Sequence, residues 1–178
     1  MASHDTRDYV LGQELRVRIL TTGAETSGRH DLVDAFQLPD TATPVHLHTR
    51  YEERFFVLEG ACTVWVGPDT TQLGPADYCA IPLDTPHAIK AGPNGCRGLL
   101  VTSPAGFAEL IARAATPAHL AGPDTETDLE RFASVSAELG DEILGPPGTR
   151  PTCDPAGTAR AALMNASNSC GMSGPVGW

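Results

Sequence analysis

Basic residues are scarce in this chain of 178 residues, where 12 Lys and Arg stand against 22 Asp and Glu and the formal net charge is −10 at pH 7. Nucleic acids and anionic membrane surfaces both require clustered positive charge, and the sequence contains no basic run. We therefore expect neither nucleic acid nor a membrane as a partner. The simpler meaning of the negative charge is solubility.

Long apolar runs are also missing. No stretch approaches the roughly 18 consecutive apolar residues of a membrane-spanning helix. Residues 1–30 are rich in charge and lack the apolar segment of a signal peptide, so the expected location is the cytoplasm. With 178 residues, 41% of them hydrophobic, the chain is suited to one domain with one core.

The five cysteines include no CxxC pair, which excludes both a zinc ribbon and a thioredoxin-like motif. Their odd number favours free thiols. Cys62 and Cys79 fall inside strand-like segments, where a small buried residue is the expected role. Cys153 and Cys170 have no role that the sequence assigns.

Short strand-like segments separated by Gly and Pro dominate the first part of the chain. Residues 15–20 alternate apolar and charged side chains, which is the pattern of a strand with one buried face. A hairpin turn is expected at residues 59–61. Further strands are expected at residues 32–38, around His46, and at residues 55–58, 62–66, 77–81, 87–90 and 98–102. About eight short strands at regular spacing predict a β-sandwich or a small barrel.

Helical periodicity replaces the strand pattern beyond residue 102. Ser103 and Pro104 predict the N-cap and first-turn proline of a helix of about three turns. A second helix is expected over residues 124–139, with capping-box spacing between Thr127 and Glu130. Both helices have one apolar face, which we expect to pack on the outside of the barrel.

Gly140 is well placed to end the second helix. From Gly145 onward the composition shifts to Gly, Pro, Ala, Ser and Thr. The expected organisation is a β-barrel over residues 1–102, a helical extension over residues 103–147 that packs on the barrel, and a flexible tail over residues 148–178.

Three histidines and one glutamate have spacing that suits a metal. His46 and His48 are two residues apart in a strand-like segment, so both side chains point to the same face. Glu53 follows five residues later, and His87 lies in a later strand-like stretch. Three imidazoles and one carboxylate are a typical set for one divalent transition metal per chain, which could be Fe, Ni, Mn, Co, Cu or Zn. Such a set leaves coordination positions open, which suggests a catalytic rather than a structural site.

The same residues resemble a known motif. The pattern HxH, four residues, Glu, six residues, Gly is met by His46, His48, Glu53 and Gly60, and it resembles the first motif of the cupin superfamily. The second cupin motif is met in part. Its Pro and His positions hold Pro82 and His87, whereas Ala76, Asp84 and Ala91 stand where the motif has two Gly and one Asn.

Two further stretches, residues 55–60 and 142–147, resemble single-domain bacterial cupins of the quercetin 2,3-dioxygenase-like group. The resemblance covers roughly residues 8–150. It implies an all-β fold, the double-stranded β-helix or jelly roll. Together with the helical periodicity beyond residue 102, the expected fold is this barrel with one or two C-terminal α-helices packed outside. It also implies that Glu53 is both a metal ligand and the general base that deprotonates an enol or phenol.

Residues that line a substrate pocket should lie an even number of positions from the ligands on the same strand, because their side chains then point to the same face. Phe55 and Val57 follow Glu53 at that parity, and Ile89 follows His87. An apolar, partly aromatic cavity would suit a flat, aromatic small molecule. The alternative is that these residues are ordinary core.

Four other residues are weaker candidates for substrate binding. Phe36 and Trp65 are aromatic, but the sequence does not fix the faces on which they lie. Arg50 and Tyr51 lie between the ligands and could orient an anionic or phenolic substrate. Surface exposure without function is the alternative for both.

Three functions are compatible with these residues. The leading hypothesis is a metal-dependent dioxygenase that uses dioxygen, and the resemblance implies an enol or phenolic, flavonol-like molecule as its substrate. One alternative is a non-redox cupin of the polyketide cyclase or isomerase type, in which the metal acts only as a Lewis acid. Another is a cupin that binds a small ligand without turnover. Phe56 and Leu58, which point away from the pocket side, predict a homodimer.

Overall fold

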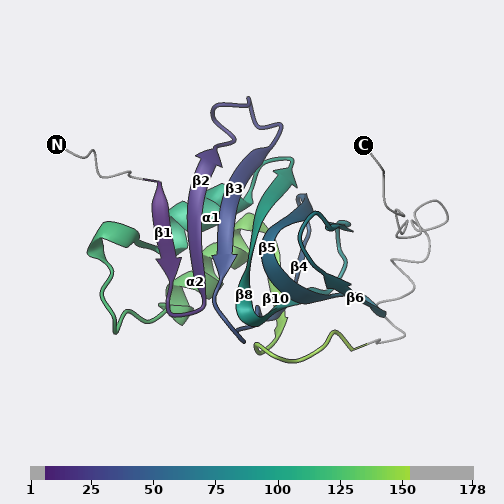
Figure 1. Cartoon of the computed structure of the whole chain (residues 1–178). Helices are drawn as coiled ribbons and strands as arrows, with labels where there is room; N and C mark the ends of the chain where they lie inside the picture. Colours follow the sequence, from purple (N-terminus) through teal and green to yellow (C-terminus); the bar gives the residue numbers. More distant parts are fainter. Residues whose placement is uncertain (1–6, 153–178) are drawn as a thin grey trace.

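Ten antiparallel strands and two helices make up the computed structural model, which describes residues 7–152 (Figure 1). The all-β jelly-roll barrel expected from the sequence is confirmed. The strands are β1 (Asp8–Leu11), β2 (Leu15–Thr21), β3 (Asp31–Gln37), β4 (Val45–His48), β5 (Glu52–Val66), β6 (Asp69–Leu73), β7 (Tyr78–Ile81), β8 (His87–Ser103), β9 (Thr116–Pro117) and β10 (Asp141–Gly145). The helices are α1 (Phe107–Ala114) and α2 (Leu129–Leu139), and a short 3-10 helix spans Ala118–Leu120.

The strands lie side by side in the order β10, β4, β8, β3, β2, β1, β9, and β5 pairs with β6, β7 and β8. The longest strand, β8, therefore pairs with β3, β4 and β5. In Figure 1, α1 and α2 lie behind β1, β2 and β3. The candidate site lies on β4 and β8, which pair with each other.

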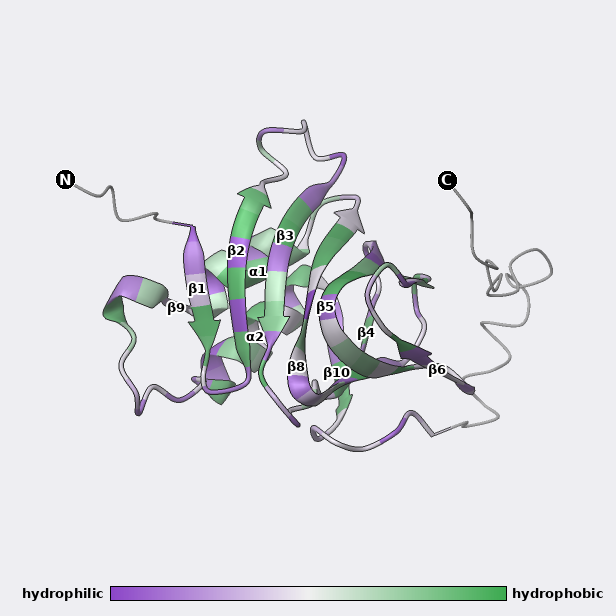
Figure 2. Cartoon of the chain, viewed as in Figure 1, coloured by the Kyte–Doolittle hydropathy of each residue, from purple (hydrophilic) through white to green (hydrophobic). Residues whose placement is uncertain are grey.

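Alternation of side chains along β2 and β3 places one face of the sheet in the core. Val17, Ile19, Val33 and Ala35 are buried, whereas their charged neighbours in β2 are exposed. Figure 2 shows the alternation as green and purple bands along β2. Burial of one such side chain contributes about 1.5–3 kcal/mol to folding.

The hairpin turn expected at residues 59–61 is wrong, because β5 runs without interruption through it. Gly60 has a φ of +75° and lies at a bulge, where the register with β8 shifts. A Cβ on Gly60 would lie 2.1 Å from the carbonyl oxygen of Gly95, so no side chain fits there. A turn and a bulge both favour glycine, and the sequence alone does not separate them. The strands expected at 87–90 and 98–102 are likewise two parts of β8.

The N-cap expected at Ser103 is also wrong, because Ser103 is the last residue of β8. Helix α1 begins at Phe107 and has no side-chain cap from its own segment. Instead the buried carboxylate of Asp31, on β3, accepts hydrogen bonds from the backbone amides of Gly106 and Ala108, both at 2.9 Å. A cap supplied by a distant strand leaves no local sequence pattern.

Helix α2 begins at Leu129, later than the sequence suggests. The side chain of Asp128 accepts from the amide of Arg131 at 3.0 Å, so the expected capping box, which starts one residue earlier, is wrong. The stop at Gly140 is confirmed, because Gly140 has a φ of 86° in the left-handed region. The two helices pack on each other through Leu110, Ala114 and Val135.

The chain beyond Ser103 is not only helical, since β9 pairs with β1 and β10 pairs with β4. The division into barrel, extension and tail stays a prediction. Most of the expected tail, together with Cys153 and Cys170, lies outside the described residues. Cys62 and Cys79 are buried, as expected. Within residues 7–152, no helix is long and apolar enough to cross a membrane.

Candidate metal centre

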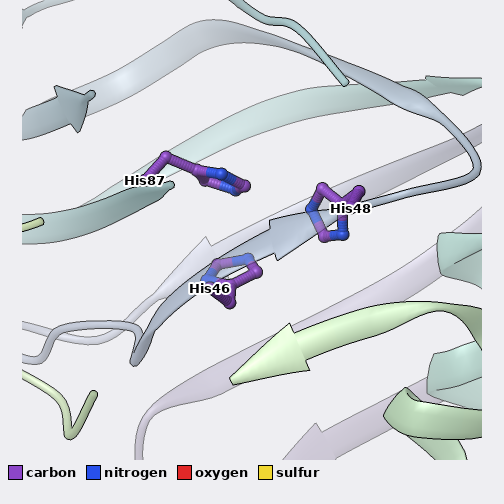
Figure 3. Close-up of side chains that lie close together, drawn as sticks. All are labelled: His46, His48 and His87. Carbon is purple, nitrogen blue, oxygen red and sulfur yellow. The ribbon is translucent and has the colours of Figure 1, made fainter. Parts of the chain in front are cut away.

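The three histidines identified from the spacing come together between β4 and β8 (Figure 3). His46 lies directly opposite His87 in the pairing of the two strands, and His48 lies on the same face of β4 as His46. The ring centroids of His46 and His87 are 4.1 Å apart, and each is 4.9 Å from that of His48. The potential ligand nitrogens all lie within 4.8 Å of one another, which forms a candidate metal site.

Backbone carbonyls set the protonation of two of these rings. The Nδ1 atoms of His46 and His87 lie 2.9 Å from the carbonyl oxygens of Pro44 and Thr85. A carbonyl oxygen only accepts, so each Nδ1 carries the proton and each Nε2 keeps its lone pair. The Nε2 of His87 is fully buried and has no hydrogen-bond partner among residues 7–152. A buried acceptor without a partner is costly, and a metal ion would satisfy it, so the donor set fits a divalent transition metal.

Carboxylates, rather than carbonyls, surround His48. Its Nδ1 lies 2.7 Å from Oδ1 of Asp141, and its Nε2 lies 3.3 Å from Oε2 of Glu53. The ring of Tyr51 stacks on His48 with centroids 4.3 Å apart, and the Tyr51 hydroxyl donates to Oδ2 of Asp141 at 3.1 Å. All four side chains are buried, with exposed fractions of 1–4%.

The electrostatics of the three histidines differ. Burial, followed by the nearby charge on His48, lowers the pKa of His46. Burial, followed by the charges on the other two histidines, lowers the pKa of His87 well below its usual value. Burial alone would also lower the pKa of His48, but its hydrogen bonds to Asp141 and Glu53 and their negative charges outweigh this effect and raise the pKa to about 9. These directions favour neutral imidazoles at His46 and His87 and a protonated imidazole at His48, whose proton a metal bound at Nε2 would have to displace.

Glu53 lies at the border of the histidine cluster. It is buried on β5, and its carboxylate contacts His48, whereas the three mutually close ligand atoms belong to histidines alone. Its role as the fourth ligand stays a prediction. The neighbouring Glu52 points away and forms an ion pair with Arg54 at 2.8 Å.

The expected pocket walls share the face of the ligands. Phe55, Val57 and Ile89 are buried, and all three belong to the main hydrophobic core. Whether they contact a substrate stays a prediction. Of the three clustered histidines, His46 is partly exposed, whereas His48 and His87 are buried.

The weaker substrate candidates lie in different places. Tyr51 is part of the site, whereas Arg50 is exposed. Phe36 lies on the outer face of β3, beside a surface groove that none of the three histidines lines. Trp65 lies opposite Ala88 in the β5–β8 pairing, on the face away from His87, and the guanidinium of Arg150 lies 5.5 Å from its ring centre.

One residue of the site, Asp141, has no counterpart in the sequence prediction. It follows the helix stop at Gly140 and lies 93 residues from His48 in sequence. A Gly stop followed by two acidic and two apolar residues is compatible with an edge strand. It does not reveal that this strand pairs with β4.

Comparisons with known proteins agree with this geometry. Residues 37–101 match the Cupin domain family. Quercetin 2,3-dioxygenase from Bacillus subtilis (strain 168) is 28% identical over 83 residues, which are 47% of this chain and 25% of the relative. The chain thus spans about a quarter of the length of this curated relative.

Solved structures share the fold. Ectoine synthase from P. lautus aligns with a TM-score of 0.52 and 20% identity, over 80% of this chain and 85% of that chain. An RmlC-like cupin from Shewanella frigidimarina NCIMB 400 aligns with a TM-score of 0.51 and 22% identity, over 59% of this chain and 89% of that chain. The histidine motif, the domain match over residues 37–101 and the jelly-roll fold agree, so this part of the chain is a cupin domain.

Proposed function

We propose that the protein is a metal-dependent dioxygenase that acts on an enol or phenolic, flavonol-like small molecule. The observation that carries the proposal is the convergence of three histidines beside the buried carboxylate of Glu53, which lies 3.3 Å from Nε2 of His48. The partial similarity to quercetin 2,3-dioxygenase supports the substrate class.

The residues that would hold the metal are His46, His48 and His87, with Glu53 as the fourth ligand. We expect one divalent transition metal per chain, and Fe, Ni, Mn, Co, Cu and Zn all accept imidazole ligands. When bound, such a metal supplies Lewis acidity toward an enolic or phenolic oxygen and, if it is redox-active, electron transfer toward dioxygen.

Glu53 is the proposed general base. Its carboxylate is buried next to the candidate ligands, where it would take the proton of a substrate hydroxyl. Loss of this proton makes the ring electron-rich and prepares it for oxidation. The buried side chains around Glu53 exclude water, and the substrate would approach from the partly exposed side of His46.

The test is oxygen uptake by metal-loaded protein with a panel of polyphenols, using Glu53→Gln and the matched control Glu52→Gln. Loss of a general base lowers turnover by about 100-fold or more, so Glu53→Gln should be slow. Glu52→Gln should behave like wild type, because Glu52 pairs with Arg54 away from the site. Full metal content and full turnover in Glu53→Gln would remove Glu53 from this role.

Two outcomes of the same assay would support the alternatives. Substrate consumption at full rate without dioxygen would replace the dioxygenase by a non-redox cupin of the cyclase or isomerase type. A stoichiometric ligand recovered unchanged after long incubation would support a binding protein without turnover.

The homodimer and the cytoplasmic location stay predictions. Phe56 and Tyr78 support the dimer, because they lie opposite each other on β5 and β7 and are 40% and 52% exposed. A second copy that covers this face would bury both rings. Light scattering that shows a monomer at micromolar concentration would contradict the dimer.

A further inference from the structure

We infer that Asp141 is a positioning residue of the metal centre and that Tyr51 holds Asp141 in place, so that α2 and β10 complete the site. The inference rests on the proposed metal centre, but it does not depend on the reaction or the substrate. Asp141 lies outside residues 37–101, which match the cupin family.

The strand pairing places Asp141 beside His48. Asp141 is the direct partner of His48 where β10 pairs with β4, and residues opposite each other in such a pair have Cβ atoms about 4.5–5.5 Å apart. The resulting contact of 2.7 Å joins Oδ1 of Asp141 to Nδ1 of His48. Since Nδ1 and Nε2 lie at different corners of the ring, Asp141 binds His48 without competing for the nitrogen that faces Glu53.

This contact distinguishes His48 from the other two histidines. His46 and His87 donate Nδ1–H to neutral backbone carbonyls, whereas His48 donates to a carboxylate. A carboxylate fixes the tautomer with Nε2 free for the metal, and its negative charge makes the imidazole a stronger donor.

Tyr51 restrains both members of the pair. Its hydroxyl donates to Oδ2 of Asp141 at 3.1 Å, which leaves Oδ1 for His48. A carboxylate oxygen accepts, so the Tyr51 hydroxyl is the donor in this contact. The Tyr51 ring lies against His48 with an angle of 26° between the planes, which restricts rotation of the imidazole.

The helical extension fixes the position of Asp141 from the other side. The carbonyl oxygen of Gly140 accepts hydrogen bonds from the backbone amide of Thr49 at 3.0 Å and from the Thr49 hydroxyl at 2.8 Å. Two hydrogen bonds between Gly140 and Thr49 therefore hold the residue before Asp141 against the residue after His48. Helix α2 directly precedes this anchor and packs on α1.

The experiment compares Asp141→Asn with the matched control Glu142→Gln, which removes the same charge from an exposed neighbour on β10. Affinity for Co²⁺ and for Zn²⁺ is measured by chelator competition on the full chain. Loss of such an outer partner typically weakens metal affinity by about 10- to 100-fold, which is the result expected for Asp141→Asn. Glu142→Gln should bind as wild type does, and equal affinity in Asp141→Asn and wild type would overturn the inference.

A spectroscopic readout separates positioning from a general loss of structure. In ¹⁵N-labelled protein, the Nδ1 signal of His48 should shift in Asp141→Asn, whereas that of His87, which donates to Thr85, should not. Tyr51→Phe keeps the stacked ring and loses only the hydroxyl, so it should weaken metal affinity in the same direction by a smaller factor. If Asp141→Asn fails to fold, unchanged affinity and an unchanged His48 signal in Tyr51→Phe would overturn the inference.

The outcomes also separate this inference from the proposed reaction. Metal-loaded wild type that consumes neither dioxygen nor any polyphenol would contradict the dioxygenase, while a weakened Asp141→Asn would still support the positioning role. Wild type that binds neither Co²⁺ nor Zn²⁺ would overturn the inference.

Discussion

The two sides of the candidate metal centre are built in different ways. His46 and His87 each donate Nδ1–H to the backbone carbonyl two residues earlier, so a short stretch of sequence sets both rings. His48 instead contacts Asp141, 93 residues away, and this contact exists only when β10 pairs with β4. The difference teaches that the motif with its local turns supplies the three candidate ligands, whereas the extension supplies the carboxylate that contacts one of them.

The largest expected effect, on stabilisation by metal, comes from His87→Ala, which removes one of the two histidines set by nearby backbone carbonyls. A metal present at about 100 times its Kd stabilises a folded protein by about 2.7 kcal/mol. Wild type should gain about this much in denaturant unfolding with Co²⁺ or Zn²⁺, whereas His87→Ala should gain nothing, because a ligand is lost.

The control for this variant is His30→Ala. His30 is exposed and lies outside the histidine cluster, so its replacement should leave the gain from metal intact. Equal stabilisation of wild type and His87→Ala by metal would show that the ion binds elsewhere.

Gly140→Ala disturbs the turn that precedes Asp141, the distant partner of His48. It should have a smaller effect, a loss of about 1–2 kcal/mol in the free energy of unfolding. Gly140 has a φ of 86°, and a Cβ there would lie 2.6 Å from Oγ1 of Thr49. Displacement of this turn should also move Asp141 and weaken metal binding.

Gly148→Ala is the matched control, because Gly148 has a similar φ of 82° and nothing lies within 4 Å of its Cβ position. It should leave metal affinity unchanged. If Gly140→Ala also binds metal as wild type does, the position of the Gly140–Asp141 segment does not contribute to metal affinity.

The smallest expected effect comes from Ala76→Gly, a change that lies outside both the histidine cluster and the Asp141 contact and should alter stability alone. Ala76 has a φ of 71° at a position where the cupin motif has glycine, and left-handed backbone costs a residue with a Cβ about 1–2 kcal/mol. Part of this cost is offset by the entropy of glycine in the unfolded chain. Ala76→Gly should therefore raise the free energy of unfolding by about 0.5–1 kcal/mol with unchanged metal affinity.

The comparison variant is Ala80→Gly, inside β7, where the same substitution should destabilise by about 0.5–1 kcal/mol. Opposite signs in the two denaturation curves are the expected result. If Ala76→Gly also lowers stability, the left-handed position is not strained.

Local patterns predicted the parts of the molecule that depend on neighbouring residues. The alternation in β2 and the shared face of His46 and His48 follow from the two-residue period of a strand. The end of α2 follows from the preference for glycine at Gly140 after a helix. The cap of α1 by Asp31 and the contact of Asp141 with His48 did not follow, because strand pairing over long separations creates both.

Trp65 shows that a bulge changes which face of a strand a side chain occupies. Odd positions in the first half of β5, including Phe55 and Val57, face the core, and this parity would place Trp65 there too. The register with β8 shifts between Val57 and Glu59 and again after Gly60, so that even positions such as Val64 face the main core. Trp65 lies on the other face of the sheet, buried in a small cluster with Val45 and Ala88.

The most direct test of the central claim is elemental analysis of purified wild type beside His48→Ala, after loosely bound ions are removed. The claim predicts close to one Fe, Ni, Mn, Co, Cu or Zn per chain in wild type and none in the variant. Wild type without metal, even after supplementation, or equal metal in both proteins, would contradict it.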